Sequence, residues 1–423
     1  MYFLDVSIRL LIKWINVIDY YIRALTGVVL FPIDSKRTVL ELEALIKERG
    51  RQFDFREPCR VQLDCLESDK KINLFGRLAV RNFLGSPAVI RKFLRYVDES
   101  PEIRKINITR PIFIVGQMRT GTTFLFNLLA QDESLFSPPF WQISDPTPRE
   151  LDRNGKDSRI KEAVGNIDLL HIYGPQTQTT HPVDALGPDE CELQFMRYFV
   201  TRDLPHTVYR NLAPYQRWYR TVDDQTLQNL YQNYKLELQS FIHQAGTQDK
   251  TVLRKDSNHA SFIRQLLATF PDARVIYTVR DPAEIVPSAC SMNESYVELS
   301  YFLADIDQKQ IGRQVLGHMM HEAECFLAYR KQYDENNQGS SQFMDINYED
   351  FIKAPMATVR CIYEHFGMEL SDAAVAKMER YIKESPQYKH GKHIYNAERY
   401  GFTVDALRKA FRDYIEYFNV RLT

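Results

Sequence analysis

The sequence predicts an α/β protein of three layers, in which helices flank a central parallel sheet and a helical N-terminal extension precedes it. Short apolar runs alternate with amphipathic helical stretches from about residue 111 onward, which is typical of a parallel sheet covered on both faces. The 423 residues, 44% of them hydrophobic, suffice for one large α/β domain with insertions or two smaller domains. We expect the helical extension over residues 1–105 and the α/β domain over residues 106–423.

The predicted elements follow from apolar spacing. In the extension, Thr38–Arg49 and Leu74–Val97 carry apolar residues at helical intervals. Four apolar runs predict strands, at Pro111–Val115, Thr251–Leu253, Ala273–Val279 and Phe343–Ile346. Further helices are expected at Thr122–Ala130, Gln216–Ala245, Ser261–Thr269, Arg313–Tyr333 and Ala357–Phe366, and one begins after Asp281. Ligands of such sheets bind beyond the carboxyl ends of the strands, so functional residues are expected there.

The first strand leads into its helix through the loop Gly116-Gln-Met-Arg-Thr-Gly-Thr-Thr123. Gly116 and Gly121 permit a tight turn in which backbone N–H groups converge on an anion at a helix N-terminus. Hydroxyl donors come from Thr120, Thr122 and Thr123, and Arg119 adds a donor fork that matches oxyanions. The spacing of the glycines matches that of a P-loop and predicts a P-loop-like fold, but a threonine occupies the position of the P-loop lysine.

The third strand ends in Arg280-Asp-Pro, and Ser288 follows within the next helix. An arginine at a strand end and a serine two turns into the helix can face one phosphate. A solvated surface charge is the ordinary alternative for such an arginine.

Together the loop and the Val-Arg-Asp-Pro segment with Ser288 resemble the superfamily of sulfotransferases that use 3′-phosphoadenosine 5′-phosphosulfate (PAPS). Further similar segments are Leu253-Arg-Lys-Asp-Ser-Asn-His259, Phe270–Ala273, Ile346–Asp350 and Gly391–Asn396. The resemblance implies that the loop binds the 5′-phosphosulfate and that Arg280 with Ser288 binds the 3′-phosphate. It implies sulfonate transfer to a hydroxyl group of an alcohol, phenol, lipid or sugar.

The resemblance also assigns individual roles. Arg119 lies near the bridging oxygen, Lys255 contacts the sulfonate or the leaving group, and Lys392 and His393 close over the 3′-phosphate. The chain departs from the family at Met118, where relatives often have proline, and at Asp256, which adds a carboxylate beside the expected reaction centre.

The general base has several candidates. His181, Glu190, Glu192 and His259 carry groups that can accept the acceptor's proton. Histidine titrates near neutrality, whereas a glutamate needs burial or a like charge to raise its pKa. Structural alternatives are a plain helix N-terminus for the glutamates and hydrogen-bonded core positions for the histidines.

Composition limits the partners and the compartment. Lysine plus arginine (54) nearly balance aspartate plus glutamate (55), so no nucleic-acid partner is expected. The six cysteines lack metal-site spacing and are too sparse for a disulfide framework, so we expect thiols in a reducing, cytoplasmic setting and no metal.

The N-terminal segment, residues 1–32, is apolar but interrupted by charges, so it predicts neither a spanning helix nor a signal peptide. Packing onto the protein's own core is one interpretation, and peripheral membrane contact through an amphipathic helix is the other.

Two other functions fit parts of the pattern. A phosphotransferase or kinase would need a loop lysine and a Mg²⁺-holding carboxylate at a strand end, whereas the chain has Thr122 and Arg280 there. A catalytically silent nucleotide-binding protein at a membrane surface is the third hypothesis, and Lys255 together with Arg119 argues against it.

Overall fold

The computed structural model describes residues 2–83, 85–153, 155–180, 182–202, 210–302, 305–384 and 396–423. The N-terminal part comprises α1 (Tyr2–Thr26), α2 (Ser35–Arg49), η1 (Arg51–Phe53), α3 (Arg56–Ser68), α4 (Leu74–Phe83), α5 (Pro87–Glu99) and η2 (Pro101–Lys105). The sheet strands are β1 (Ile112–Gly116), β2 (Leu135–Phe136), β3 (Thr251–Lys255), β4 (Arg274–Val279) and β5 (Phe343–Asn347).

Helices separate these strands along the chain. Between β1 and β3 lie α6 (Thr122–Leu129), α7 (Phe140–Ser144), α8 (Ser158–Tyr173), α9 (Thr177–Thr180), α10 (Glu192–Arg197), α12 (Ala213–Arg220) and α13 (Asp224–Ala245). After β3 come α14 (Asn258–Ser261), α15 (Ile263–Thr269), α16 (Pro282–Ser300) and α17 (Gln308–Asn336). The chain ends with α18 (Tyr348–Lys353), α19 (Pro355–His365), α20 (Asp372–Glu384), η4 (Ala397–Tyr400), α21 (Val404–Ala410) and α22 (Arg412–Tyr417).

The strands form one parallel sheet in the order β2-β3-β1-β4-β5. β1 is central, with Ile114 opposite Lys255 of β3 on one side and Ile276 of β4 on the other. The carboxyl ends of β1, β3 and β4 therefore lie side by side, which brings the loop after β1 next to Lys255 and Arg280.

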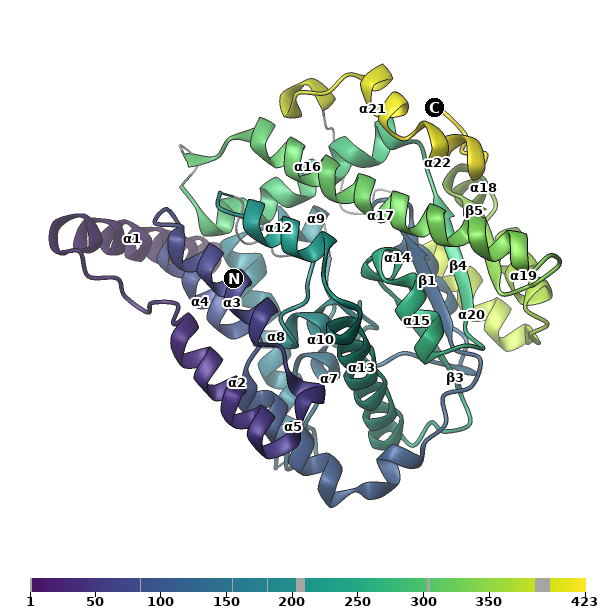
Figure 1. The fold of residues 1–423 in the computed structure, drawn as a ribbon, viewed down its shortest axis with the longest axis horizontal. Helices are drawn as coiled ribbons and strands as arrows, with labels where there is room; N and C mark the ends of the chain where they lie inside the picture. The colour runs from purple at the N-terminus through teal and green to yellow at the C-terminus, as the bar shows by residue number, and fades with distance from the viewer. Residues whose placement is uncertain are drawn as a thin grey trace.

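Side chains of β1 alternate between two cores, as the two-residue period of a strand requires. Ile112 and Ile114 pack with α6, α19 and α20, whereas Phe113 and Val115 join a larger core with α13, α15, α16 and α17. Figure 1 shows the sheet on the right and the N-terminal helices on the left. These two covered faces confirm the predicted three-layer α/β fold.

The N-terminal helices confirm the predicted helical extension, and residues of α2, α3 and α5 share the larger core with the sheet. The boundary placed near residue 105 stays a prediction. No helix in the described part of the chain is both long enough and apolar enough to span a bilayer.

Two long predicted helices were wrong in extent. The stretch predicted as Leu74–Val97 is two helices, because Pro87 opens α5 at a position where proline is favoured as a helix start. The stretch Gln216–Ala245 is also divided, because the side chain of Asp223 accepts a hydrogen bond from the Thr226 amide and caps α13. Periodicity continues across both breaks, so spacing alone did not reveal them.

Candidate active site

The loop after β1 contains three residues whose φ angles are positive. Gly116 and Gly121 have positive φ, and Arg119 adopts a left-handed φ of 71°. A Cβ on Gly116 would lie 2.3 Å from Thr278 Oγ1, and one on Gly121 would lie 2.8 Å from Tyr348 Cδ2. Both positions therefore exclude any side chain, which fixes the turn at the N-terminus of α6.

Loop hydroxyls have distinct partners. Thr120 is fully buried, and its Oγ1 donates to the Gln117 carbonyl and lies 2.6 Å from Thr278 Oγ1 on β4. Thr120 thus fastens the loop to the sheet. Thr122 and Thr123 line the cavity described below, so their hydroxyls are on the ligand side of the loop.

The two arginines predicted to hold opposite ends of one nucleotide lie together. Arg280 Nη1 donates to the Arg119 carbonyl at 3.1 Å, and Arg119 Nε donates to Ser288 Oγ at 3.0 Å. Arg119 Nη1 also donates to the carbonyl of Thr180 at 2.9 Å. The loop, the end of β4 and the first turns of α16 therefore form one continuous basic site.

The C-terminal segment positions the second arginine. Asp281 is fully buried, caps α16, and accepts hydrogen bonds from Arg408 Nη2 at 2.6 Å and from the Thr423 amide at 3.1 Å. The Arg280 amide donates to Tyr414 Oη at 3.3 Å. Because its backbone is held from three sides, the Arg280 guanidinium lies over the Tyr348 ring, 4.0 Å from the ring centre.

Lys255 lies at the carboxyl end of β3, next to the loop. Its Nζ donates to Thr123 Oγ1 at 3.2 Å and forms an ion pair with Glu190. The lysine is almost wholly buried, so this ammonium is held in place by both partners. The predicted lysine and one predicted carboxylate are thereby brought together with the anion-binding loop.

Asp189, beside Glu190, is a site residue that the sequence analysis did not single out. It lines the same cavity as Glu190, Arg119 and Thr123, and its Oδ1 accepts a hydrogen bond from the Glu190 amide at 2.6 Å. Burial, followed by the nearby Glu190 carboxylate, raises the pKa of Asp189 to about 6. No sequence signal separates it from the adjacent acids, because the shift arises from packing.

Arg254 holds this acidic segment against the sheet. Its fully buried side chain donates from Nη1 to the Asp189 carbonyl at 3.0 Å and from Nη2 to Gln194 Oε1 at 3.1 Å. The Cys191 amide donates to the Lys255 carbonyl at 3.3 Å. Neighbouring residues of β3 thus place the two carboxylates and the lysine relative to one another.

His259 is not part of this site. The ring is fully buried among aromatic side chains, 5.1 Å from the Phe113 ring centre, and its Nδ1 lies 2.8 Å from Tyr231 Oη. Burial, aided by the Arg254 charge, lowers the pKa of His259 to about 3. The structure therefore places this histidine in the core, away from the cavity that Lys255 adjoins.

Two acids near the lysine belong to a buried polar network. Asp256 Oδ1 accepts from the Asn258 amide at 2.8 Å and from Asn258 Nδ2 at 2.9 Å, and Asn258 also donates to Glu192. Tyr219 Oη donates to Asn258 Oδ1 at 2.8 Å. Asp256 was expected beside the reaction centre, but its carboxylate is turned into this network, and it does not line the cavity.

Three predicted site residues, His181, Lys392 and His393, lie outside the described residues. Their predicted roles stay predictions. In the described part of the chain, no group of three or more histidine, cysteine, aspartate or glutamate side chains is placed to hold a metal ion.

A cavity of about 850 Å³ adjoins the basic site. Its polar end contains Arg119, Thr122, Thr123, Asp189 and Glu190. Apolar residues of the remainder include Ile8, Ile12 and Ile15 of α1, Leu74, Phe75 and Leu78 of α4, Ile167 and Leu170 of α8, Leu193 and Met196 of α10, Met292 and Leu299 of α16, and Met118 of the loop. Charged residues also line it, including Asp145, Arg159, Glu162, Arg197 and Arg202. A molecule bound here would present one polar end to the loop and an apolar body to the helices.

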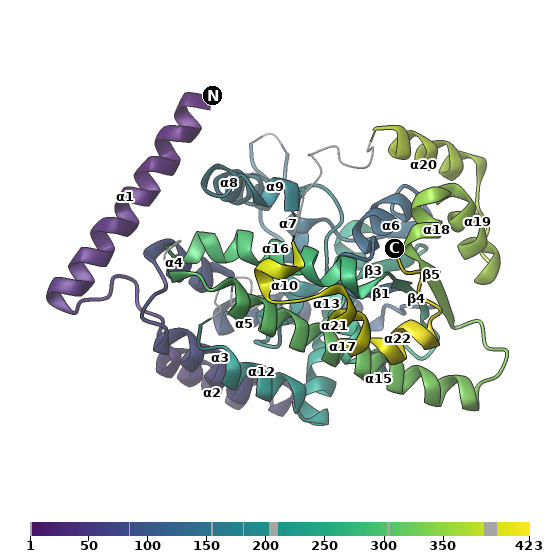
Figure 2. The same cartoon turned by 90° about the horizontal axis from the view of Figure 1, so that it is seen from above.

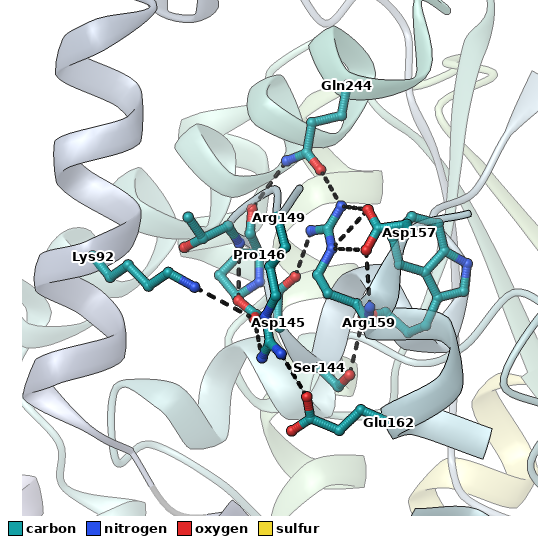
Figure 3. A network of polar contacts seen from close by, with 11 residues as sticks. Lys92, Ser144, Asp145, Pro146, Arg149, Asp157, Arg159, Glu162 and Gln244 are labelled. Carbon is teal, nitrogen blue, oxygen red and sulfur yellow. Dashed lines mark hydrogen bonds and ion pairs between the residues drawn. The ribbon is translucent and has the colours of Figure 1, made fainter. Parts of the chain in front are cut away.

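Ionic contacts brace one wall of this cavity, as Figure 3 shows. The buried Arg159 of α8 donates to Asp157 from two nitrogens, to the Asp145 carbonyl at 2.8 Å and to Gln244 Oε1 at 3.1 Å. Arg149 pairs with Asp145 at 2.7 Å and extends the network to the surface. The network ties α8 to α13 and to the segment after α7.

The fold and the basic P-loop-like turn beside a cavity are typical of a group-transfer enzyme with an anionic donor. The model of the Sulfotransferase family matches residues 111–372, and the chain belongs to this family. The match covers β1 to the start of α20, including the loop, Lys255 and Arg280.

Similar proteins agree with this assignment. The omega-hydroxy-beta-dihydromenaquinone-9 sulfotransferase Stf3 of Mycobacterium bovis is 25% identical over 296 residues, which are 68% of this chain and 71% of that protein. The crystal structure of sulfotransferase STF9 from Mycobacterium avium has a TM-score of 0.76 at 24% identity and covers 90% of this chain and 96% of its own. The structure of STF1 from Mycobacterium tuberculosis has a TM-score of 0.73 at 25% identity and covers 90% and 99%.

Proposed function

We propose that this sulfotransferase moves a sulfonate group from PAPS to a hydroxyl group of an acceptor bound in the 850 Å³ cavity. The observation that carries the proposal is the contact between Arg280 and the Arg119 carbonyl, with Ser288 bonded to Arg119. One bisphosphorylated nucleoside can therefore reach both arginines. Family membership supports sulfonate transfer, and the donor's identity is the part that we add.

The residues of the loop and of β4 suit the two anionic ends of this donor. Backbone N–H groups at the start of α6, with Thr122 and Thr123, face the side on which the 5′-phosphosulfate would lie. Arg280 and Ser288 would hold the 3′-phosphate, by a charge-assisted hydrogen bond in the case of the arginine. Lys392 and His393 remain proposed contacts to that phosphate.

Transfer is an in-line displacement at sulfur. The acceptor oxygen forms a bond to the sulfur while the bond from sulfur to the phosphate oxygen breaks, and the electron pair stays on the phosphate. Lys255 and Arg119 would stabilise the charge that develops on the sulfonate and on the leaving phosphate.

The proton of the acceptor hydroxyl must pass to a base. Asp189 and Glu190 both line the cavity beside the loop, whereas His259 is buried elsewhere. Glu190 is held by Lys255, and the raised pKa of Asp189 makes its carboxylate a stronger base than an ordinary aspartate. We therefore propose this carboxylate pair as the proton acceptor, with His181 as the alternative.

The cavity indicates the acceptor class. The apolar side chains that α1, α4, α8 and α16 contribute to its walls suit a hydroxyl-bearing small molecule or lipid with an apolar body. The relative Stf3 is named for a hydroxylated dihydromenaquinone, which is consistent with a long apolar acceptor. We further propose that the protein is cytoplasmic, contacts a membrane peripherally and has no nucleic-acid partner.

Differential stabilisation by nucleotides tests the donor. We expect adenosine 3′,5′-bisphosphate to raise the melting temperature of the wild-type protein, because its two phosphates occupy the loop and the site of Arg280 and Ser288. ATP with Mg²⁺ should leave the melting temperature nearly unchanged. Arg280→Ala should lose this stabilisation. Stabilisation by ATP with Mg²⁺ alone would instead support the phosphotransferase, and bisphosphate binding without transfer to any phenol, alcohol, sugar or sterol would support the silent nucleotide-binding protein.

A further inference from the structure

The N-terminal helix α1 has one face against the protein. Ile8, Ile12 and Ile15 of this face line the cavity, and the buried Asn16 donates from Nδ2 to Tyr173 Oη at 2.9 Å. Asp19 on the same face is buried and pairs with Arg77 at 2.6 Å. Polar anchors therefore fix the rotation of α1, so its opposite face is held outward.

The outward face of α1 is also apolar. Leu11, Trp14, Ile18, Tyr21 and Leu25 recur at intervals of three and four residues, and each is at least half exposed, with Leu25 at 82%. Leu10 lies beside them, and Val28 and Phe31 continue the exposed apolar surface beyond the helix. In Figures 1 and 2 α1 lies at the outer edge of the molecule, so its outward face points away from the other helices and the sheet. We call these eight residues the α1 stripe.

A stripe of this kind needs a partner, because soluble proteins rarely expose contiguous apolar patches of such length. Its chemistry favours a lipid surface over a second copy of the chain. Trp14 and Tyr21 are the residue types that concentrate at the interface between lipid and water. The exposed Lys13 lies one turn from Leu10 at the edge of the stripe, where it can meet anionic headgroups.

The α1 stripe adjoins the acceptor cavity on its other side. Ile15 is 41% exposed and also lines the cavity, and Leu169 of α8 has the same two properties at 42% exposure. The rim of the cavity is therefore apolar at these two residues, where it lies next to the stripe. A hydrophobic molecule could pass from a surface that covers the stripe into the cavity without crossing a polar barrier at these residues.

We propose that α1 docks on a membrane surface through the α1 stripe, and that the acceptor is a long-chain membrane alcohol drawn from that bilayer into the cavity. The helix then serves as a wall of the acceptor site on one face and as the membrane contact on the other. The inference rests on the proposed function for the identity of the cavity as the acceptor site.

Vesicle flotation with the full chain tests the docking surface. We expect the wild-type protein to float with vesicles of phosphatidylcholine and phosphatidylglycerol. Leu11→Asp/Leu25→Asp should lower the partition coefficient by about tenfold or more, because both substitutions place charge in the apolar contact. The matched control is Leu40→Asp/Leu422→Asp, which adds the same charge at exposed leucines outside the stripe and should bind as the wild type does.

Acceptor delivery is tested by label transfer from PAPS to a crude lipid extract. With the extract in vesicles, Leu11→Asp/Leu25→Asp should slow labelling several-fold, and with the same extract in detergent it should not. Labelling of an extract of water-soluble metabolites assayed in parallel, with no labelling of the lipid extract, would overturn the acceptor class. Equal labelling by both proteins in vesicles would overturn delivery through α1.

Other outcomes separate this inference from the proposed function. If the wild-type protein fails to float but adenosine 3′,5′-bisphosphate still stabilises it, the docking proposal fails and the sulfotransferase assignment stands. If the bisphosphate has no effect, the donor proposal fails whatever the vesicles show. A lipid-free dimer that Leu11→Asp/Leu25→Asp converts to monomer would show that a second copy covers the stripe, and would overturn membrane docking.

Discussion

Gly121→Ala is expected to weaken the donor site from a position that carries no functional group. Gly121 has a left-handed φ of 85°, which costs an alanine roughly 1–2 kcal/mol. The new Cβ would lie 2.8 Å from Tyr348 Cδ2, roughly 0.6 Å inside the 3.4 Å at which ordinary contact begins. The Tyr348 ring must therefore move, and this ring lies beneath the Arg280 guanidinium. Since the loop and Arg280 are both disturbed, we expect the dissociation constant of adenosine 3′,5′-bisphosphate to rise by about tenfold, or ~1.4 kcal/mol.

The matched control is Gly246→Ala at the end of α13. Gly246 also has a left-handed φ, of 63°, but a Cβ there meets no atom within 4 Å. Both variants should lose similar stability from backbone strain, measured by urea unfolding, and only Gly121→Ala should lose nucleotide affinity, measured by calorimetry. Wild-type affinity in a folded Gly121→Ala protein would refute the reasoning.

Three further predictions concern the site and its support. Arg280→Ala should raise the dissociation constant of the bisphosphate about 10- to 100-fold. Lys255→Ala should mainly lower kcat, by about 10²-fold or more, since the lysine stabilises charge that develops during transfer. Equal effects of the two variants on nucleotide affinity, measured by calorimetry, would contradict these separate roles. If the Asp189 carboxylate accepts the proton, kcat should rise with pH through about 6, and Asp189→Asn should lose most activity. Because the folded pKa of Asp189 lies above the ordinary 3.8, its contribution to the stability of the fold falls as the pH rises from about 4 to 6. The stability of Asp189→Asn, measured by unfolding across that pH range, should lack this decline. Arg159→Ala should destabilise the fold by about 1–3 kcal/mol in urea unfolding, because it leaves the half-buried Asp157 and Gln244 without this partner, whereas Arg37→Ala at an exposed pair should change it by less than about 1 kcal/mol.

The sequence was sufficient where the chemistry is local. The Gly116–Thr123 loop needs glycines for its turn, and the start of α16 needs Asp281 and Pro282, so both were predicted from their residues. Strand and helix periodicities predicted the α/β architecture for the same reason, because each is a property of a few consecutive residues. Breaks inside a continuous period, such as Pro87 and Asp223, were missed.

Contacts between distant segments needed the tertiary structure. The pKa of Asp189 is raised by its packing beside Glu190, and the aromatic side chains that surround His259 come from distant parts of the chain. Arg280 is aimed by residues more than 120 positions later in the chain.

The sequence by itself determined that the chain has an anion-binding turn, a parallel sheet and the residue types of a sulfotransferase, since these depend on local backbone requirements and short spacings. Only the tertiary structure decided which acids face the lysine, and that α1 is apolar on both its cavity face and its outer face. Burial and the distance between charges set these properties, and both depend on which distant segments pack together.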